Sequence, residues 1–254
     1  MYRFLLLFLL IFELALGYTL NSQQIKLLRQ AYTIANKYKA IDGHRFGDTV
    51  CAIYLTESDA GKNIIGDVNK MLKGNNTILD ASLGPGQIRL VTALEMMRNH
   101  PDMFPKQYLQ LAHPDYYAYK KFVYYQHQIY KFRHILRLYK NKKGNRAYRV
   151  RKWAIRELNY YEYKNSLYWK YYKRYYYKDI TIVNKLLSDY KFSIIITTAK
   201  LIDSYNYAYK HHMWNPWFKT ISKYNGGWYN KKYYRRVILN MSIVRDLKQK
   251  GIIK

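Results

Sequence analysis

The sequence predicts a mainly helical protein in which a long helical insertion interrupts an ordinary helical domain. Apolar residues recur at three- and four-residue spacing in several segments, which is the pattern of amphipathic helices. Between residues 145 and 224 the chain has no glycine and a single proline, Pro216, so long helices are allowed there. Because 49% of the 254 residues are hydrophobic, there is enough apolar material for one good-sized core.

The N-terminus is typical of an export signal. Arg3 precedes a short apolar run, residues 4–12, and small residues follow up to Gly17. This pattern predicts a signal peptide over residues 1–17, cleavage near Gly17 and a periplasmic or secreted mature protein. The alternative is an uncleaved anchor helix, which the short run and Glu13 disfavour. No other stretch of the sequence predicts a transmembrane helix.

Three helices are predicted in the first hundred residues. The first covers residues 22–40, with Asn21 or Ser22 as its cap. The second covers residues 47–57, and Gly61 is the expected stop signal after it. A loop is expected over residues 61–83, and the third helix follows Gly84-Pro85-Gly86 and ends before Pro101.

The composition changes after residue 101. Residues 102–189 carry roughly half of the net positive charge and more than half of the tyrosines. Residues 141–145 form the natural turn, so this block predicts a hairpin of two long basic helices. Beyond it we expect a helix over residues 194–207, loops over 214–217 and 221–227, and a last helix over 229–247.

The formal charge of +28 indicates a polyanionic neighbour. Nucleic acid, an acidic membrane surface and an acidic cell-wall polymer all satisfy it. Aromatic residues interleaved with lysine and arginine in 102–189 suit such a partner. The alternative is structural: the tyrosines form the packed face of the hairpin while the lysines are solvated.

Neither a cofactor nor a metal is expected. Cys51 is the only cysteine, so no intramolecular disulfide forms, and its apolar neighbours predict a buried core position. His211 and His212 are adjacent, so on a helix they face different directions and make a poor metal pair.

Glu57 is the candidate catalytic acid. It lies at the predicted C-terminal end of a helix, one turn after Ile53, and therefore beside apolar neighbours. Partial desolvation and the negative end of the helix dipole both favour its protonated form. A general acid working near neutral pH needs that property.

Two later motifs supply candidate substrate contacts. In the segment from Ser82 to Ile88, glycines leave backbone groups accessible at a helix start, and Gln87 offers an amide. In Tyr224-Asn225-Gly226-Gly227, the tyrosine face suits a sugar ring and the asparagine an N-acetyl group, while Gly226 keeps the loop low.

The ordered set resembles the soluble lytic transglycosylase domain, a lysozyme-like family. Glu57-Ser58 comes first, then a Ser-x-Gly-x-x-Gln-Ile segment, then Tyr-Asn-x-Gly followed by a tyrosine-bearing helix. The resemblance covers roughly residues 25–100 and 190–241. It departs from the family at Pro85 and Gly86, where two apolar residues are usual, and in the extra basic block.

The resemblance implies a discontinuous lysozyme-like catalytic domain, residues 18–101 and 190–254, with the helical insertion at 102–189. It implies cleavage of the β-1,4 bond between N-acetylmuramic acid and N-acetylglucosamine in peptidoglycan, with Glu57 alone acting as acid and then base to form a 1,6-anhydro ring. Ser82, Gln87, Tyr224, Asn225 and Gly226 would contact the glycan or shape its cleft.

Two other functions are consistent with the sequence. If Asp59, Asp67 or Asp80 positioned a water, the enzyme would be a hydrolytic lysozyme. Alternatively, the scaffold is degenerate and binds envelope or DNA without catalysis. We favour the enzyme, because the acid is present. As the partner of residues 102–189 we favour an anionic envelope polymer or membrane surface over nucleic acid.

Overall fold

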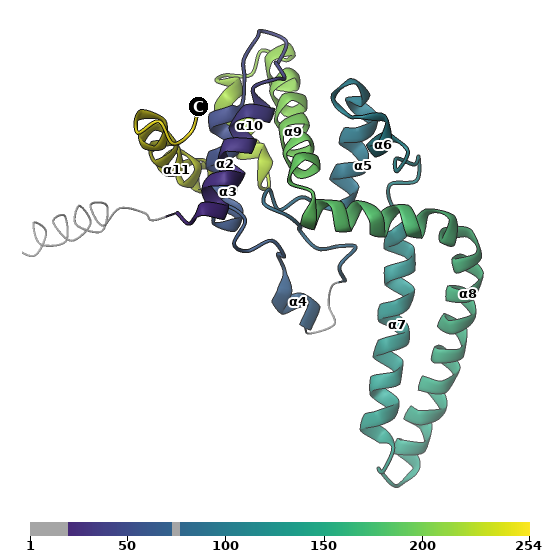
Figure 1. The fold of residues 1–254 in the computed structure, drawn as a ribbon. Coiled ribbons are helices and arrows are strands. Elements are labelled where there is room, and N and C mark those ends of the chain that lie inside the picture. The colour runs from purple at the N-terminus through teal and green to yellow at the C-terminus, as the bar shows by residue number, and fades with distance from the viewer. Residues whose placement is uncertain (1–19, 73–76) are drawn as a thin grey trace, which may run out of the picture. The chain divides into compact units, whose positions relative to one another are not determined.

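The protein is described by a computed structural model that covers residues 20–72 and 77–254 (Figure 1). The predicted signal peptide, residues 1–17, lies outside the described residues. Within them the chain forms helices, and the only β pairing is a pair of isolated bridges, Ile65–Leu83 and Leu83–Ile88. The mainly helical class is therefore confirmed. The helices are α2 (Ser22–Ala35), α3 (Gly47–Ser58), α4 (Val68–Leu72), α5 (Leu90–Asn99), η1 (Pro101–Met103), α6 (Lys106–Leu109), α7 (Ala118–Tyr139), α8 (Asn145–Ser188), α9 (Tyr190–Lys210), α10 (Pro216–Tyr224) and α11 (Lys231–Gln249).

The chain divides into two compact units. Unit 1 combines Met1–Lys62, described from residue 20 on, with Leu201–Lys254, and unit 2 is Asn63–Lys200. These boundaries differ from the predicted ones at 101/102 and 189/190. The segment from residue 63 to residue 101 clusters with the hairpin, and helix α9 contributes residues to both units.

Unit 1 is built around α3, which packs against α2 and α11. Ten of the twelve residues of α3 are buried, among them Val50, Ile53 and Tyr54. A helix that is apolar on nearly all sides belongs in a core, and here two amphipathic helices cover it. Cys51 is fully buried, as predicted, and burial raises the pKa of its thiol.

Asparagine caps set the starts of three helices in unit 1. The side chains of Asn21, Asn215 and Asn230 accept hydrogen bonds from the backbone N–H groups of Gln24, Phe218 and Tyr233, at 2.9 to 3.0 Å. Each cap satisfies an otherwise unpaired donor of a first helical turn. In α10, Pro216 follows the cap at the first position, where its missing N–H costs nothing.

Unit 2 contains the predicted basic hairpin. Helices α7 and α8, of 22 and 44 residues, pack against each other and are joined by a turn at residues 140–144. Figure 1 shows the first part of α8 alongside α7. Aromatic rings fill the seam: Phe122 lies within 6 Å of the rings of Trp169, Tyr172 and Tyr176.

A buried polar cluster joins α8 to the segment before α7. The Asp179 carboxylate, fully buried, is 2.7 Å from His113 Nε2 and accepts a hydrogen bond of 2.5 Å from the Tyr172 hydroxyl. Burial, together with the charge of Asp179, raises the pKa of Tyr172. An enclosed carboxylate needs such partners, so the cluster fixes the base of the hairpin.

Several predicted boundaries are wrong. The first helix ends at Ala35 rather than residue 40, because the Asn36 side chain turns to accept the Gly47 N–H. The predicted 61–83 loop contains the short helix α4. Residues 216–224 are helical rather than loop, since Asn215-Pro216 is a cap and first turn. Among the described residues, no helix is long and apolar enough to cross a bilayer.

We predict a large loss of stability for Gly84→Ala. Gly84 has a φ of +70°, and an added Cβ would lie 2.1 Å from the Leu186 carbonyl oxygen. Gly144 also has a positive φ, +96°, but nothing lies within 4 Å of its added Cβ. Gly144→Ala should therefore cost backbone strain alone, about 1–3 kcal/mol. Gly84→Ala should cost about 1–3 kcal/mol more, because the carbonyl cannot yield easily. Urea unfolding of the two variants tests this, and equal losses would contradict it.

Candidate active site

The two side chains of α3 that escape burial are both acidic, and they have different surroundings. Asp48 is neutralised by Lys248, whose Nζ lies 3.0 and 3.1 Å from its two oxygens. Glu57 instead accepts a hydrogen bond from the neutral side chain of Asn225, at 3.3 Å from Nδ2 to Oε1. Among the residues that the structure describes, no cation forms an ion pair with Glu57.

The end of α3 is held by side chains from two other helices, α11 and α2. Arg236 Nη2 donates to the Thr56 carbonyl at 2.9 Å, and Asn240 Nδ2 donates to the Thr56 hydroxyl at 2.8 Å. Gln24 Nε2 donates to the Asp59 carbonyl at 2.7 Å. The last carbonyls of a helix lack intrahelical partners, so these donors help to satisfy them and fix the backbone on which Glu57 sits.

The backbone turns sharply just after the acid. Asp59, Ala60 and Gly61 all have positive φ values, 52°, 52° and 86°. This conformation is costly for a residue such as alanine and persists only where surrounding contacts impose it. The Ala60 N–H returns to the Tyr54 carbonyl at 2.9 Å, and Ser58 Oγ accepts from the Gly61 N–H at 2.8 Å. The turn therefore sharply terminates the helix at Glu57-Ser58.

Asn225 is positioned by the loop between α10 and α11. Its carbonyl accepts a hydrogen bond from the Asn230 side chain, which also caps α11. Gly226 follows with a φ of +111°, a conformation that favours glycine. Two of the predicted contact residues, Asn225 and Gly226, are thus exposed on the loop that reaches Glu57.

The buried hydroxyl of Tyr233 lies near the Glu57 carboxylate. Tyr233 lies in the first turn of α11 and is 3% exposed. Burial raises the pKa of Tyr233 well above its usual value, and the negative charge of Glu57 raises it further. The phenol therefore stays protonated next to the carboxylate, as a neutral neighbour rather than a second charge.

The role predicted for Tyr224 needs correction. Its ring is 6% exposed and stacks parallel to that of Tyr233, with centroids 6.3 Å apart. A buried ring offers no open face to a sugar, so Tyr224 packs against Tyr233 instead. The exposed tyrosine of this loop is Tyr229, at 73%, with the Lys219 ammonium 3.2 Å from its ring centroid.

Ser82 and Gln87 lie together in unit 2, where they shape a loop. The Ser82 carbonyl accepts from the Gly66 N–H at 2.7 Å. Gln87 Nε2 donates to the carbonyls of Asn63 and Gly84, at 3.0 and 3.1 Å, and its own φ is +50°. The Gln87 side-chain nitrogen is thus hydrogen-bonded to two backbone carbonyls, and these bonds stabilise the loop. Contact of either residue with a substrate stays a prediction.

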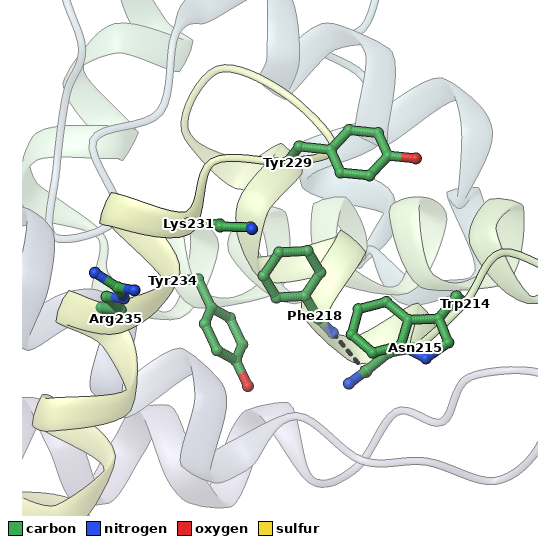
Figure 2. Close-up of a pocket in the computed structure, with 7 residues that line it drawn as sticks. All are labelled: Trp214, Asn215, Phe218, Tyr229, Lys231, Tyr234 and Arg235. Carbon is green, nitrogen blue, oxygen red and sulfur yellow. Dashed lines mark hydrogen bonds between the residues drawn. The ribbon is translucent and has the colours of Figure 1, made fainter.

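Unit 1 also carries an aromatic pocket of about 530 Å³, shown in Figure 2. It lies between the segment before α10, α10 itself and the start of α11. Aromatic and cationic side chains form its walls: Trp214, Asn215, Phe218, Tyr229, Lys231, Tyr234 and Arg235. Neither Glu57 nor Asn225 lines it. The pocket is therefore a neighbouring surface feature and not the place where the acid acts.

Nothing matches the chain in comparisons with protein-family models, curated proteins or solved structures. The chemistry of the site is therefore inferred from its own residues. In the described part of the chain, no three His, Cys, Asp or Glu side chains gather in a way that could hold a metal ion.

Sequence reasoning missed the side chains that α11 contributes. Tyr233, Arg236 and Asn240 follow at positions i, i+3 and i+7, so they share one face of the helix, and that face meets the end of α3. The spacing was visible in the sequence. It carried no sign of function, because one face of almost every helix shows such spacing, and only the packing of α11 on α3 gives it meaning.

A prediction about pH follows from Tyr233. Because its folded-state pKa is raised, the folded protein holds this proton more tightly than the unfolded chain. Stability from this group is fully present below about pH 10, the ordinary tyrosine pKa, and falls as pH rises beyond it. In Tyr233→Phe the fall should be shallower by up to about 1.4 kcal/mol per pH unit. Urea unfolding between about pH 9 and about pH 11.5, which brackets that pKa, measures it.

The matched control for this experiment is Tyr229→Phe, which removes the same atom from a side chain that is 73% exposed. Its pH profile should follow that of the parent protein. If Tyr233→Phe also kept the parent slope, the pKa of Tyr233 would not be raised in the folded protein.

Proposed function

We propose that the protein is an exported peptidoglycan lytic transglycosylase with Glu57 as its catalytic acid and base. One observation carries the proposal: the half-buried Glu57 carboxylate accepts a hydrogen bond from Asn225, at 3.3 Å. Asn225 is exposed on a distant loop, and Glu57 has no ion-pair partner among the described residues. Their sequence separation is 168 residues, so the fold, and not local geometry, brings them together.

Within the part of the chain that the structure describes, Glu57 has no ion-pair partner, although Arg236 lies close by on the Thr56 carbonyl. Lysine and arginine outnumber aspartate and glutamate by 44 to 16, so a carboxylate readily finds a positive partner. A fixed cation would hold the acid in its charged form and prevent it from donating a proton. The Glu57 carboxylate is hydrogen-bonded to the neutral amide of Asn225, and the guanidinium of Arg236 is bonded to the Thr56 carbonyl rather than to the acid.

A single carboxylate is sufficient for the proposed reaction. Glu57 protonates the oxygen that bridges N-acetylmuramic acid and N-acetylglucosamine, and that bond breaks. The resulting carboxylate then takes the proton of the muramic 6-hydroxyl, whose oxygen closes the 1,6-anhydro ring. Because the attacking hydroxyl belongs to the same sugar, no second acid is required to activate a water.

Asn225 fits the position of a substrate contact. It is exposed, and its amide is hydrogen-bonded to the acid, so an N-acetyl group that binds it lies beside the carboxylate. The lysozyme-like assignment of the helical domain is part of the same proposal, supported by the order of the three sequence motifs.

Glu57→Gln should abolish the release of muropeptides from purified sacculi, with a loss of at least ~10²–10⁴ in rate, while the helical circular dichroism stays unchanged. Mass spectrometry of the products of the parent protein should show anhydro ends, lighter by one water than hydrolysed ends. A Glu57→Gln variant that cleared sacculi at the parent rate would remove Glu57 from catalysis.

Asp59→Asn is the matched control, since Asp59 is the nearest acid along the chain and asparagine tolerates its left-handed backbone. We expect it to remain active with anhydro products. Hydrated ends from the parent protein, together with loss of activity in Asp59→Asn, would instead indicate a hydrolase that uses Asp59 to position water.

Asn225→Ala should lower kcat/KM on sacculi by roughly 10- to 100-fold, which corresponds to the loss of one hydrogen bond to a charged or reacting group. Asn141→Ala removes an exposed asparagine from the hairpin turn and should leave the rate unchanged. Equal rates for both variants would show that Asn225 is not part of the site.

A further inference from the structure

The end of the hairpin concentrates positive charge without any acid. We define the hairpin tip as residues 131–156, the last part of α7, the turn and the first part of α8. It holds eleven lysine and arginine residues and no aspartate or glutamate. All but Arg151 are exposed, and Arg151 has a structural role, because its Nη1 donates to the carbonyls of Tyr139 and Lys142, at 2.9 and 2.7 Å, and so closes the turn.

Most of this charge is unpaired within the described part of the chain. Only Arg133 and Arg156 contact a carboxylate, at 2.8 and 3.1 Å from Glu162 and Glu157. Closely spaced like charges repel each other, which makes the free protein less stable. An anionic surface relieves that repulsion, so the tip is suited to one.

The tip is a packed structure, so the helix faces that carry its exposed side chains are fixed. Phe132, Ala147 and Ala154 are buried between the two helices, and the Phe132 ring contacts the Trp153 ring at a centroid distance of 5.3 Å. The exposed faces of α7 and α8 at the tip are therefore defined by the helical repeat.

Large apolar side chains are exposed among the cations. Leu138 is 54% exposed, Ile155 48%, Tyr148 59% and Trp153 42%. Tyr148, Lys152 and Ile155 are separated by four and three residues, so they form one stripe along α8. Cations with exposed leucine, isoleucine and aromatic rings are the mixture found where helices lie at a bilayer surface.

We propose that the hairpin tip docks on a membrane surface that contains anionic lipids. Lysine and arginine would contact the headgroups, while Leu138, Tyr148 and Ile155 would enter the boundary with the acyl chains. The aliphatic side chains favour a bilayer over nucleic acid, because bases stack on aromatic rings and guanidinium planes, and Leu138 and Ile155 offer neither. They also distinguish a bilayer from an acidic wall polymer, which has no apolar phase. The proposal does not depend on the lytic activity.

Vesicle flotation with the mature full-length protein tests it. The protein should float with vesicles of phosphatidylglycerol and phosphatidylcholine but stay unbound with phosphatidylcholine alone. Arg146→Gln, Arg149→Gln and Lys152→Gln together should weaken binding at least about tenfold, because each cation adds to the attraction. The control removes three exposed cations elsewhere in unit 2, by Lys170→Gln, Lys173→Gln and Lys191→Gln, and should bind nearly as the parent does.

A second variant separates a bilayer from other polyanions. Leu138→Ser with Ile155→Ser changes no charge and affects only exposed positions. It should weaken vesicle binding and leave retention on a DNA oligonucleotide unchanged. Failure of the parent protein to float with anionic vesicles, equal losses in the tip and control variants, or vesicle binding unaffected by the two serines would each overturn the proposal.

Discussion

The burial of α3 is the constraint on which the site depends. A helix enclosed on nearly all sides cannot leave the carbonyl groups of its last turn to water, so the protein supplies donors for them from α2 and α11. The hydrogen bonds that satisfy the end of the helix also fix the residue that emerges from it. Glu57 is therefore held by the core of unit 1, while its carboxylate remains half-exposed.

The same helix shows how environment assigns different roles to two acids. Asp48, near the start of α3, has a lysine across from it and serves as a surface ion pair. Glu57, at the other end, has an asparagine amide and a buried phenol. In a protein with an excess of cations, a carboxylate that has no ion-pair partner among the described residues is the less expected arrangement.

The positive charge of the basic hairpin is distributed unevenly along it. The basic hairpin keeps a conventional aromatic seam between α7 and α8, and a buried Asp179 cluster at its base, so part of its tyrosine content is structural. At the tip the balance changes, because cations and large apolar side chains are exposed together there. The aromatic seam therefore fits the packing interpretation of this block, while docking is proposed for the tip alone.

The sequence by itself determined the mainly helical class, the hairpin with its turn, the buried Cys51 and the position of Glu57 at the end of a helix. These depend on periodicity, on glycine and proline, and on side-chain size, all of which act locally. It missed the helix at 216–224, where the cap and proline signals were present but were interpreted as a loop. Only the tertiary structure decided that Asn225 meets Glu57 and that Tyr224 is buried while Tyr229 is exposed. It also decided that Arg236 and Asn240 are bonded to Thr56, the residue before the acid. Those contacts join segments far apart in the chain, and local patterns carry no information about which helix face a distant loop will meet.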